Sequence, residues 1–366
     1  MTGSNLTFRG LTLRNVEVPL RRPLLTRIKT FETMAFLLID LLTEEGITGH
    51  AYLFGYSPRG NANFISPLRQ IEEMLKGAAV EPEALFDRAR AGLSLMGHSG
   101  IAMMAISGFD MACWDAKAKA EGRPLFRLLG GEAGSIPAYN STGLGIMAPD
   151  AAAEEALELL AEGGFGAVKI RLGRGTLEED VAAVRAVRAA VGDDVALPSD
   201  FNQCLDLGEA LKRCRALDGE GLYWIEEPIV YDDFGGMARI AAEIETPVQI
   251  GENFYGPGDM ARAITAKAAD YMMPDAERIG GVTGWLRAAV LAEAAGIPVS
   301  SHIFPEISAH LLAATPTRQW LEYVDWANPI LAEPLAVENG SAVIAEVPGT
   351  GIAWNEAAVG RYAVDL

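Results

Sequence analysis

The sequence predicts an α+β domain followed by a β/α barrel, and three observations support this prediction. The chain has 366 residues, about twice the length of an ordinary single-core domain. Strand-like segments precede helix-like segments over roughly the first 130 residues, which is the α+β pattern. After Gly130 and Gly131, short apolar strands alternate with helix-length segments, as in a β/α barrel. A doubly wound parallel sheet is the alternative, but it rarely keeps so many evenly spaced parallel strands in succession.

The first domain, residues 1–130, is expected to begin with strands at residues 6–18, 35–42 and 48–54. Residues 44–46, Glu-Glu-Gly, suit a tight turn between the last two strands, so the three should form an antiparallel meander. From residue 67 to residue 121 the apolar spacing changes to the helical period. Gly122 and Pro124 end the last helix.

The barrel domain is expected at residues 131–325. Its eight strands are expected at residues 136–140, 167–172, 195–200, 222–226, 248–252, 271–275, 298–302 and 320–323. The remaining segment, residues 326–366, contains Pro329, Pro334 and Pro348. It is expected to be irregular and to return to the first domain.

Charge and cysteine content exclude several classes of protein. Thirty Lys and Arg residues against 49 Asp and Glu residues give a formal charge of -19, which repels nucleic acids and anionic membranes. An anionic substrate would therefore need local positive charge. Three scattered cysteines are too few for a disulfide framework or a zinc site. Because the sequence shows no secretory signal or membrane span, we expect a soluble, cytoplasmic protein.

A polar residue ends almost every expected barrel strand. These residues are Lys169 with Arg171, Asp200, Glu226, Glu252, Asp275, His302 and Glu322. The successive separations from Arg171 are 29, 26, 26, 23, 27 and 20 residues, which is one β/α unit per step. Barrel enzymes place their active sites at the carboxyl ends of the strands, so the repeat predicts an active site there.

Asp200, Glu226 and Glu252 end three consecutive strands, so their carboxylates should converge. Three such charges cannot all stay ionised without a neutralising partner. An all-oxygen ligand set favours Mg²⁺. The alternative is that the three acids are solvated charges at loop ends.

The other strand-end residues suggest an anion site and a base. Lys169 and Arg171 are two residues apart and point to the same face of one strand, which favours an anionic ligand between them. Alternatively, one of them is an interior ion-pair partner of the acids. Asp275 and His302 end neighbouring strands, so Asp275 can orient the imidazole of His302 as a general base.

These residues lie in segments that closely resemble the mandelate racemase subgroup of the enolase superfamily, over essentially the whole chain. The matching segments are HAYLFGYSP, FDMACWDAKAK, AVKIRLG, SDFNQCLD, WIEEP, GEN, MPDA, IGGVTGW and SSHIFPEISAHLLAATPT. The resemblance implies an α+β capping domain over a modified TIM barrel of (β/α)7β type. It also implies Mg²⁺ bound by the three acids and a catalytic dyad of His302 and Asp275.

The resemblance assigns further roles around the substrate. Glu322 is expected to be the acid near the substrate carboxylate, and the contacts to the bound acid are expected from Lys169, Asn202 and Ser141. Phe54 and Tyr56 match the capping-loop segment that closes over the substrate. A large symmetric homo-oligomer, such as an octamer, is also implied.

One position departs from the family pattern. Racemases of the subgroup have Lys-x-Lys on the second strand, and here the segment is Lys169-Ile170-Arg171. The second lysine is the base opposite the histidine in that family, whereas arginine stays protonated and accepts a proton poorly. This change weakens the expectation of two-base racemisation.

We predict an enzyme that uses Mg²⁺ to remove the α-proton of a small carboxylate substrate through an enediolate. The first choice of reaction is racemisation or epimerisation of a 2-hydroxy acid, because the resemblance extends into the capping loop. The alternative is dehydration of an aldonate or aldarate by His302, with Arg171 acting electrostatically. A metal-binding protein without catalysis is the third possibility. Specificity is expected from the loops at residues 26–32 and 54–63.

Overall fold

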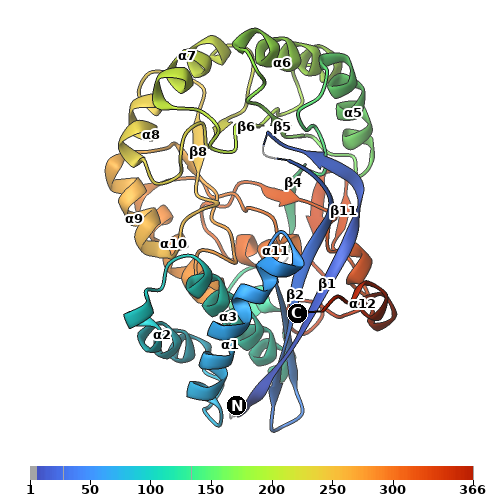
Figure 1. The fold of residues 1–366 in the computed structure, drawn as a ribbon, viewed down its shortest axis with the longest axis vertical. Coiled ribbons are helices and arrows are strands. Elements are labelled where there is room, and N and C mark those ends of the chain that lie inside the picture. The colour runs from blue at the N-terminus through green and yellow to red at the C-terminus, as the bar shows by residue number, and fades with distance from the viewer. Residues whose placement is uncertain (1–5, 28, 133, 366) are drawn as a thin grey trace.

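The computed structural model describes residues 6–27, 29–132 and 134–365. Residues 1–5 and 366, at the ends of the expected terminal segments, and residue 28, in the first expected specificity loop, lie outside the described residues. A ring of helices surrounds short parallel strands, and a sheet with helices on one side lies below it (Figure 1). This arrangement is the (β/α)7β barrel with a capping domain that the sequence predicts.

The N-terminal sheet has the order β1-β2-β3 and is antiparallel throughout. Its strands are β1 (Phe8–Leu25), β2 (Thr30–Thr43) and β3 (Thr48–Phe54). The predicted end of the first strand at residue 18 was wrong, because β1 continues to Leu25. Pro19 and Pro23 interrupt the alternating sequence pattern. The pairing of β1 with β2 nevertheless continues beyond them, with a shift of register between Pro19 and Leu24.

Helices cover one face of this sheet. They are α1 (Pro58–Leu75), α2 (Pro82–Gly92), the short η1 (Ser94–Met96), α3 (Ile101–Ala120) and α4 (Leu125–Leu128). Helix α3 is buried along most of its length and contacts β3. A Cβ atom at Gly49 would lie 2.0 Å from the carbonyl oxygen of Ala112, so this close approach requires glycine.

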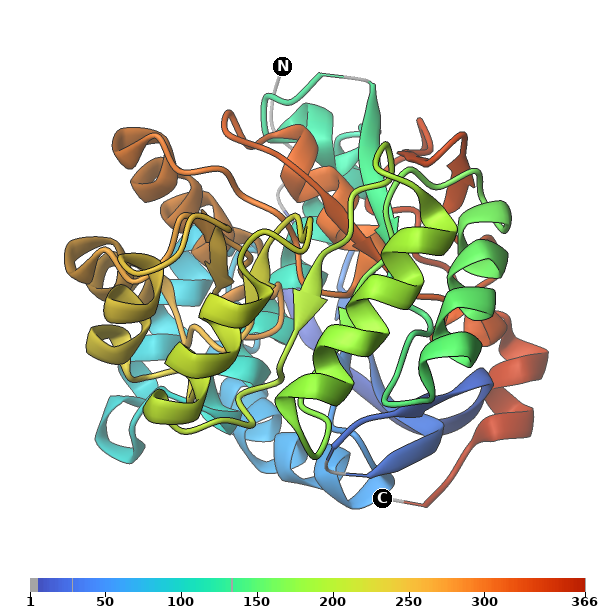
Figure 2. The same ribbon diagram turned by 90° about the horizontal axis from the view of Figure 1, so that it is seen from above.

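Helices connect the consecutive barrel strands. The elements are β4 (Ser135–Asn140), α5 (Pro149–Ala161), β5 (Ile170–Arg171), α6 (Leu177–Val191), β6 (Ser199–Asp200), α7 (Leu207–Leu217), β7 (Ile225–Glu226), α8 (Phe234–Ala241), β8 (Val248–Ile250), α9 (Pro257–Ala266), β9 (Tyr271–Met272), α10 (Gly281–Ala295), α11 (Pro305–Ala313) and β10 (Leu321–Tyr323). One helix separates each pair of consecutive barrel strands from β4 to β9, and two helices, α10 and α11, lie between β9 and β10. Figure 2 shows several of these helices from the side, around the central strands.

The strands close into a ring through ladders and single bridges. Strands β5 to β9 form one parallel sheet, and β10 is parallel to β4. A bridge between Asn140 and Val168 joins β4 to β5, and bridges from Val299 to Met272 and to Arg318 join β9 to the chain before β10. Residues 298–302, predicted as a strand, make only such bridges, and Pro298 has no N–H to donate.

The C-terminal segment touches both domains. The hairpin of β11 (Ala336–Glu338) and β12 (Ser341–Val343) adds antiparallel to β4, after the short η2 (Asn328–Ile330). Helix α12 (Glu356–Tyr362) then lies against β1. The prediction of an irregular segment was therefore wrong over the hairpin, whose turn uses Asn339 and Gly340, both with positive φ. The domain boundaries at residues 130 and 325 stay predictions.

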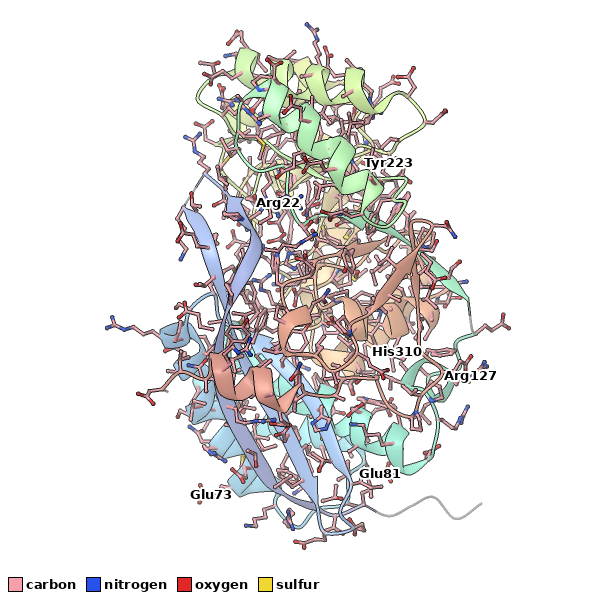
Figure 3. The ribbon with its side chains drawn as sticks, turned by 90° about the vertical axis from the view of Figure 1, so that its right-hand side faces the viewer. Arg22, Glu73, Glu81, Arg127, Tyr223 and His310 are labelled. Atoms are coloured by element: carbon pink, nitrogen blue, oxygen red, sulfur yellow. The ribbon has the colours of Figure 1, made fainter. Side chains whose placement is uncertain are left out.

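The β1–β2 hairpin extends beyond the capping domain and reaches the barrel. Arg22, labelled in Figure 3, forms ion pairs with Glu155 in the middle of α5 at 3.0 Å and with Glu162 just after α5 at 3.2 Å. Arg27 donates to the carbonyl oxygen of Gly173, just after β5, at 2.7 Å. The hairpin is thus fixed beside the carboxyl ends of the barrel strands.

Two sequence expectations concern cysteines and membrane spans. Cys113, Cys204 and Cys214 are all free, as their scattered positions suggest. Over the described residues, we find no helix that combines the length and the apolar character needed to cross a bilayer.

The buried carboxylate of Asp115 connects α3, β3 and the C-terminal segment. It accepts from the backbone N–H of His50 and of Thr350, each at 2.7 Å, and from the Thr350 hydroxyl at 2.8 Å. Lys119 forms an ion pair with it at 2.6 Å.

We predict that Asp115→Ala lowers the free energy of unfolding by about 3 kcal/mol, because it leaves buried donors without an acceptor. Urea denaturation followed by circular dichroism measures the change. The control is Asp87→Ala, which removes an exposed ion pair with Arg287 and should cost about 1 kcal/mol or less. Equal losses in the two variants would contradict this account of how the C-terminal segment is held.

Candidate active site

Three buried carboxylates meet at the carboxyl ends of β6, β7 and β8. Oxygen atoms of Asp200, Glu226 and Glu252 all lie within 4.8 Å of one another. Asp200 and Glu226 are register partners in adjacent parallel strands. Glu252 follows Gly251, whose φ of 134° turns the chain at the end of β8. The parallel register therefore brings these residues together, as the sequence spacing predicts.

The donor set of this triad suits a hard divalent cation. Burial raises the pKa of Asp200, and the charge of Glu252 adds to this effect against the opposing charge of Lys169. Burial also raises the pKa of Glu226, to about 8, although Lys169 opposes it. All three candidate ligands are carboxylates, and such an all-oxygen ligand set is typical of Mg²⁺. A bound dication would favour the ionised form of all three acids.

Lys169 lies at the centre of the acidic residues. Its side chain is 1% exposed, and its Nζ lies 2.7 Å from Glu322, 3.0 Å from Glu226 and 3.5 Å from Asp200. Burial works to lower its pKa, but the surrounding carboxylates outweigh burial and raise the pKa well above its usual value. Lys169 is therefore a fixed positive charge and not a proton acceptor.

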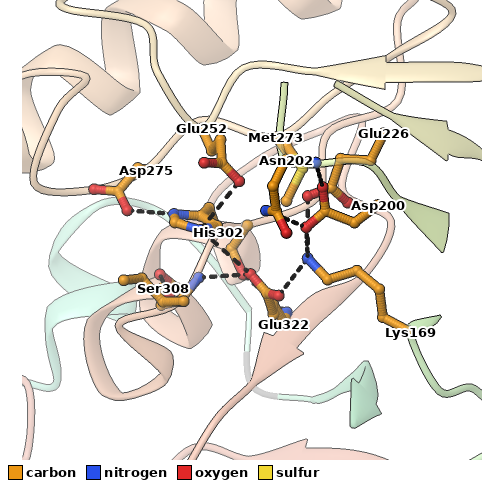
Figure 4. Close-up of polar contacts among 12 residues, drawn as sticks. Lys169, Asp200, Asn202, Glu226, Glu252, Met273, Asp275, His302, Ser308 and Glu322 are labelled. Atoms are coloured by element: carbon orange, nitrogen blue, oxygen red, sulfur yellow. Dashed lines mark hydrogen bonds and ion pairs between the residues drawn. The ribbon is translucent and has the colours of Figure 1, made fainter. Parts of the chain in front are cut away.

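His302 and Asp275 form the expected dyad. Nδ1 of His302 lies 2.6 Å from Oδ2 of Asp275, and Nε2 lies 3.3 Å from Glu252 (Figure 4). Oδ1 of Asp275 accepts from the backbone N–H groups of Glu277 at 2.7 Å and Arg278 at 3.1 Å. The carboxylate is thus held so that Nδ1 carries a proton and Nε2 faces the acidic cluster.

The charge around His302 raises its pKa. Burial alone lowers it, but the Glu252 charge and the hydrogen bond to Asp275 outweigh burial and raise the pKa to about 9. A cation bound by Glu252 would offset the largest of the raising contributions. With the cation present, His302 becomes better suited to accept a proton near neutral pH.

Glu322 lies between the lysine and the histidine. Its Oε1 accepts from Lys169, and its Oε2 accepts from the backbone N–H of Ile303 at 3.0 Å and lies 4.0 Å from Nε2 of His302 (Figure 4). Burial raises its pKa, but Lys169 and His302 outweigh burial and lower it to about 2. Glu322 is therefore an ionised acceptor in this arrangement.

Arg171 lies apart from the hydrogen-bond network of Lys169. Its side chain is buried, and Nη1 donates to the carbonyl oxygen of Gly143, in the loop after β4, at 3.0 Å. Its charge is still close enough to lower the pKa of Asp200. Arg171 thus contributes positive charge at the end of β5.

The four residues expected to contact the substrate differ in their burial and in their hydrogen-bond partners. Ser141 is buried, and its hydroxyl has no hydrogen-bond partner among the described residues. Asn202 donates to Asp200 at 2.7 Å, so it also orients a carboxylate of the triad. Tyr56 is 42% exposed, whereas Phe54 is 2% exposed and contacts the Tyr56 ring with centroids 4.3 Å apart. Phe54 therefore supports the loop, while Tyr56 reaches its surface.

Sequence reasoning missed polar residues that hold this site together. Asn253 donates to Glu227 at 3.0 Å and to Glu252 at 3.1 Å, and Glu227 is a fourth buried acid beside the triad. Glu277 and Arg278 were missed as well. Each follows a strand-end acid within three residues, so a search for polar residues just beyond those acids would have found them.

Comparisons with known proteins agree with the fold. Residues 8–130 match the mandelate racemase/muconate lactonizing enzyme N-terminal domain, and residues 151–358 match the enolase C-terminal domain-like family. The L-talarate/galactarate dehydratase of Salmonella typhimurium is 32% identical over 334 residues, which cover 91% of this chain and 83% of that protein. Other relatives include sugar-acid dehydratases, cycloisomerases and an N-succinyl-Arg/Lys racemase.

Two crystal structures show how closely the fold is shared. An enolase from Bradyrhizobium, complexed with magnesium and mandelic acid, is 42% identical with a TM-score of 0.95 and covers 100% of both chains. The L-talarate dehydratase of Polaromonas sp. JS666, complexed with Mg and L-glucarate, is 32% identical with a TM-score of 0.90 and covers 99% of this chain and 98% of that one. The chain is an enzyme of the mandelate racemase/muconate lactonizing enzyme family, within the enolase superfamily.

Proposed function

We propose that this enzyme removes the α-proton of a sugar acid with His302 and then eliminates the β-hydroxyl as water. When bound by Asp200, Glu226 and Glu252, Mg²⁺ would supply positive charge that stabilises the developing negative charge of the substrate carboxylate. The geometry supports one proton-transfer residue, and the relatives named as sugar-acid dehydratases support the reaction class.

The observation that carries this proposal is the position of His302, whose Nε2 faces the acidic cluster while Asp275 contacts Nδ1. Nε2 of His302 takes the α-proton while Asp275 holds Nδ1–H in place. Lys169 provides fixed charge for the enediolate. The protonated His302 then returns its proton to the β-hydroxyl, the C–O bond breaks and water leaves. The resulting enol tautomerises to a 2-keto acid, so atoms and charge balance.

Racemisation of a 2-hydroxy acid is the second candidate. The 42% identical Bradyrhizobium enolase was crystallised with mandelic acid, which favours this alternative. Racemisation needs a proton donor on the face opposite His302, and Arg171 is the residue proposed there. Since arginine holds its proton firmly, we place dehydration first.

Location and assembly complete the proposal. The free cysteines fit a reducing compartment and support a cytoplasmic enzyme. The family resemblance supports a homo-oligomer such as an octamer. The net charge of -19 supports a small-molecule substrate and argues against nucleic-acid or membrane partners.

We predict that incubation with a panel of mono- and diacid sugars and aryl hydroxy acids yields a 2-keto acid from at least one sugar acid. A semicarbazide assay detects the product. His302→Asn should lower the rate by about 10² to 10⁴, and Asp275→Asn by less, because the first removes the proton-transfer group and the second only its orientation. His98→Asn, in the loop after η1, is the control.

Each outcome of this panel has a defined meaning. A change in optical rotation without formation of a keto acid would show racemisation and would refute the proposed dehydration. Neither turnover nor α-deuterium exchange with any compound would favour a metal-binding protein without catalysis. If the His302→Asn variant turned over substrate at the wild-type rate, His302 would not be the base that takes the α-proton.

We also predict that activity requires a divalent metal bound by the triad. Exhaustive chelation should abolish turnover, and Mg²⁺ should restore it. Glu226→Gln should lower activity about 100-fold or more, because it removes both a ligand and a compensating charge. In wild type, Mg²⁺ at about 100 times its Kd should add about 2.7 kcal/mol of stability, measured by thermal unfolding.

Glu220→Gln is the matched control for the metal experiment, because Glu220 pairs with Arg185 on the surface. It should keep both the activity and the Mg²⁺-dependent stabilisation. Full activity of the chelated enzyme, or an unchanged Mg²⁺ response in Glu226→Gln, would refute the metal assignment.

A further inference from the structure

The capping loop, residues 54–57, is attached to the barrel by a short coupling segment, residues 275–278. The coupling segment follows β9 and begins with Asp275 of the dyad. Its Glu277 accepts from the backbone N–H of Phe54 at 3.1 Å, and its Arg278 donates to the hydroxyl of Tyr56 at 2.9 Å. Two side chains of the barrel therefore hold two consecutive parts of the loop.

Arg278 also contacts the metal-binding triad. Its side chain is 4% exposed, and Nη1 donates to the main-chain carbonyl oxygen of Glu252 at 3.0 Å while Nη2 donates to Tyr56. A planar guanidinium can hold both acceptors at once, which an ammonium group cannot do in the same geometry. One buried cation thus connects the capping loop to the backbone of a proposed metal ligand.

The same segment fixes the dyad through its backbone. The N–H groups of Glu277 and Arg278 both donate to Oδ1 of Asp275, whose Oδ2 lies 2.6 Å from His302. A movement of residues 275–278 would therefore shift the Asp275 carboxylate, whose contact with His302 is shown in Figure 4.

Tyr56, the residue of the capping loop that contacts Arg278, has features that favour opening of the loop. Tyr56 is 42% exposed, so the loop residue that contacts Arg278 lies at the surface of the protein. Its φ of 62° lies in the left-handed region, which is unfavourable for a non-glycine residue. Ring contacts with Phe31 and Phe54, at centroid distances of 6.1 and 4.3 Å, hold the closed arrangement. A few specific contacts thus balance a strained backbone.

We propose that Arg278 is a positioning residue that couples closure of the capping loop to the geometry of Glu252 and of the His302–Asp275 dyad. Loop closure orients the guanidinium on the Glu252 carbonyl, and metal binding at Glu252 in turn favours the closed loop, as linkage requires. The inference rests on the proposed function only in assigning the triad to a metal and the dyad to proton transfer.

Hydrogen–deuterium exchange of the full-length protein tests the connection without any substrate. Tyr56→Phe removes only the hydroxyl acceptor, and Arg278→Lys keeps the charge but cannot hold both acceptors. Each should speed exchange in peptides covering residues 54–57 by about 2- to 10-fold, the equivalent of one hydrogen bond. Tyr362→Phe, in α12, is the control and should leave these peptides unchanged. Unchanged exchange in both test variants would overturn the proposal.

A second measurement separates coupling from simple support of the loop. Mg²⁺ should slow exchange of residues 54–57 in wild type, and this protection should be smaller in Arg278→Lys, whose Mg²⁺ affinity should fall by the same factor. Calorimetric titration with Mg²⁺ alone measures that affinity. Equal Mg²⁺ protection in wild type and Arg278→Lys would overturn the coupling. Failure of the sugar-acid panel would leave both measurements intact, so the two proposals fail separately.

Discussion

The arrangement of the whole active site depends on neutralising a group of buried carboxylates. Asp200, Glu226 and Glu322 lie 2.7 to 3.5 Å from the ammonium group of Lys169, and oxygen atoms of Glu252, Asp200 and Glu226 lie within 4.8 Å of one another. One lysine cannot balance so many charges at low dielectric, so a dication completes the site. This need for neutralisation explains why positively charged residues lie beside the acidic residues at the carboxyl ends of the barrel strands.

The same constraint decides which group can move a proton. Lys169 is committed to its carboxylates, and Arg171 is bound to a backbone carbonyl. His302 remains, held by Asp275 at Nδ1, with Nε2 directed toward the acidic cluster, 3.3 Å from Glu252. A site with one such group suits elimination, in which a single residue takes one proton and returns it to the leaving hydroxyl. The coupling segment then connects that residue to the capping loop.

Much of this site could be predicted from strand-end spacing, because parallel strands bring residues separated by one β/α unit to the same edge. The triad, the dyad and Lys169 meet as expected. The lengths of the strands could not be predicted, since β5 and β6 are only two residues long and bridges replace the ladders around residues 298–302. The C-terminal hairpin could have been found from Asn339-Gly340. The link from Arg278 to Tyr56 joins residues that are 222 positions apart, which no local pattern reports.

The most direct test of the single-base account is α-deuterium incorporation from deuterated water into each enantiomer of an accepted 2-hydroxy acid. The account predicts fast exchange from the face of His302 and exchange slower by about 10² to 10⁴ from the face of Arg171. Arg171→Lys should raise the slow rate and leave the fast rate nearly unchanged. Equal wild-type rates from both enantiomers would show that Arg171 exchanges protons as well as His302 does, and would contradict the account.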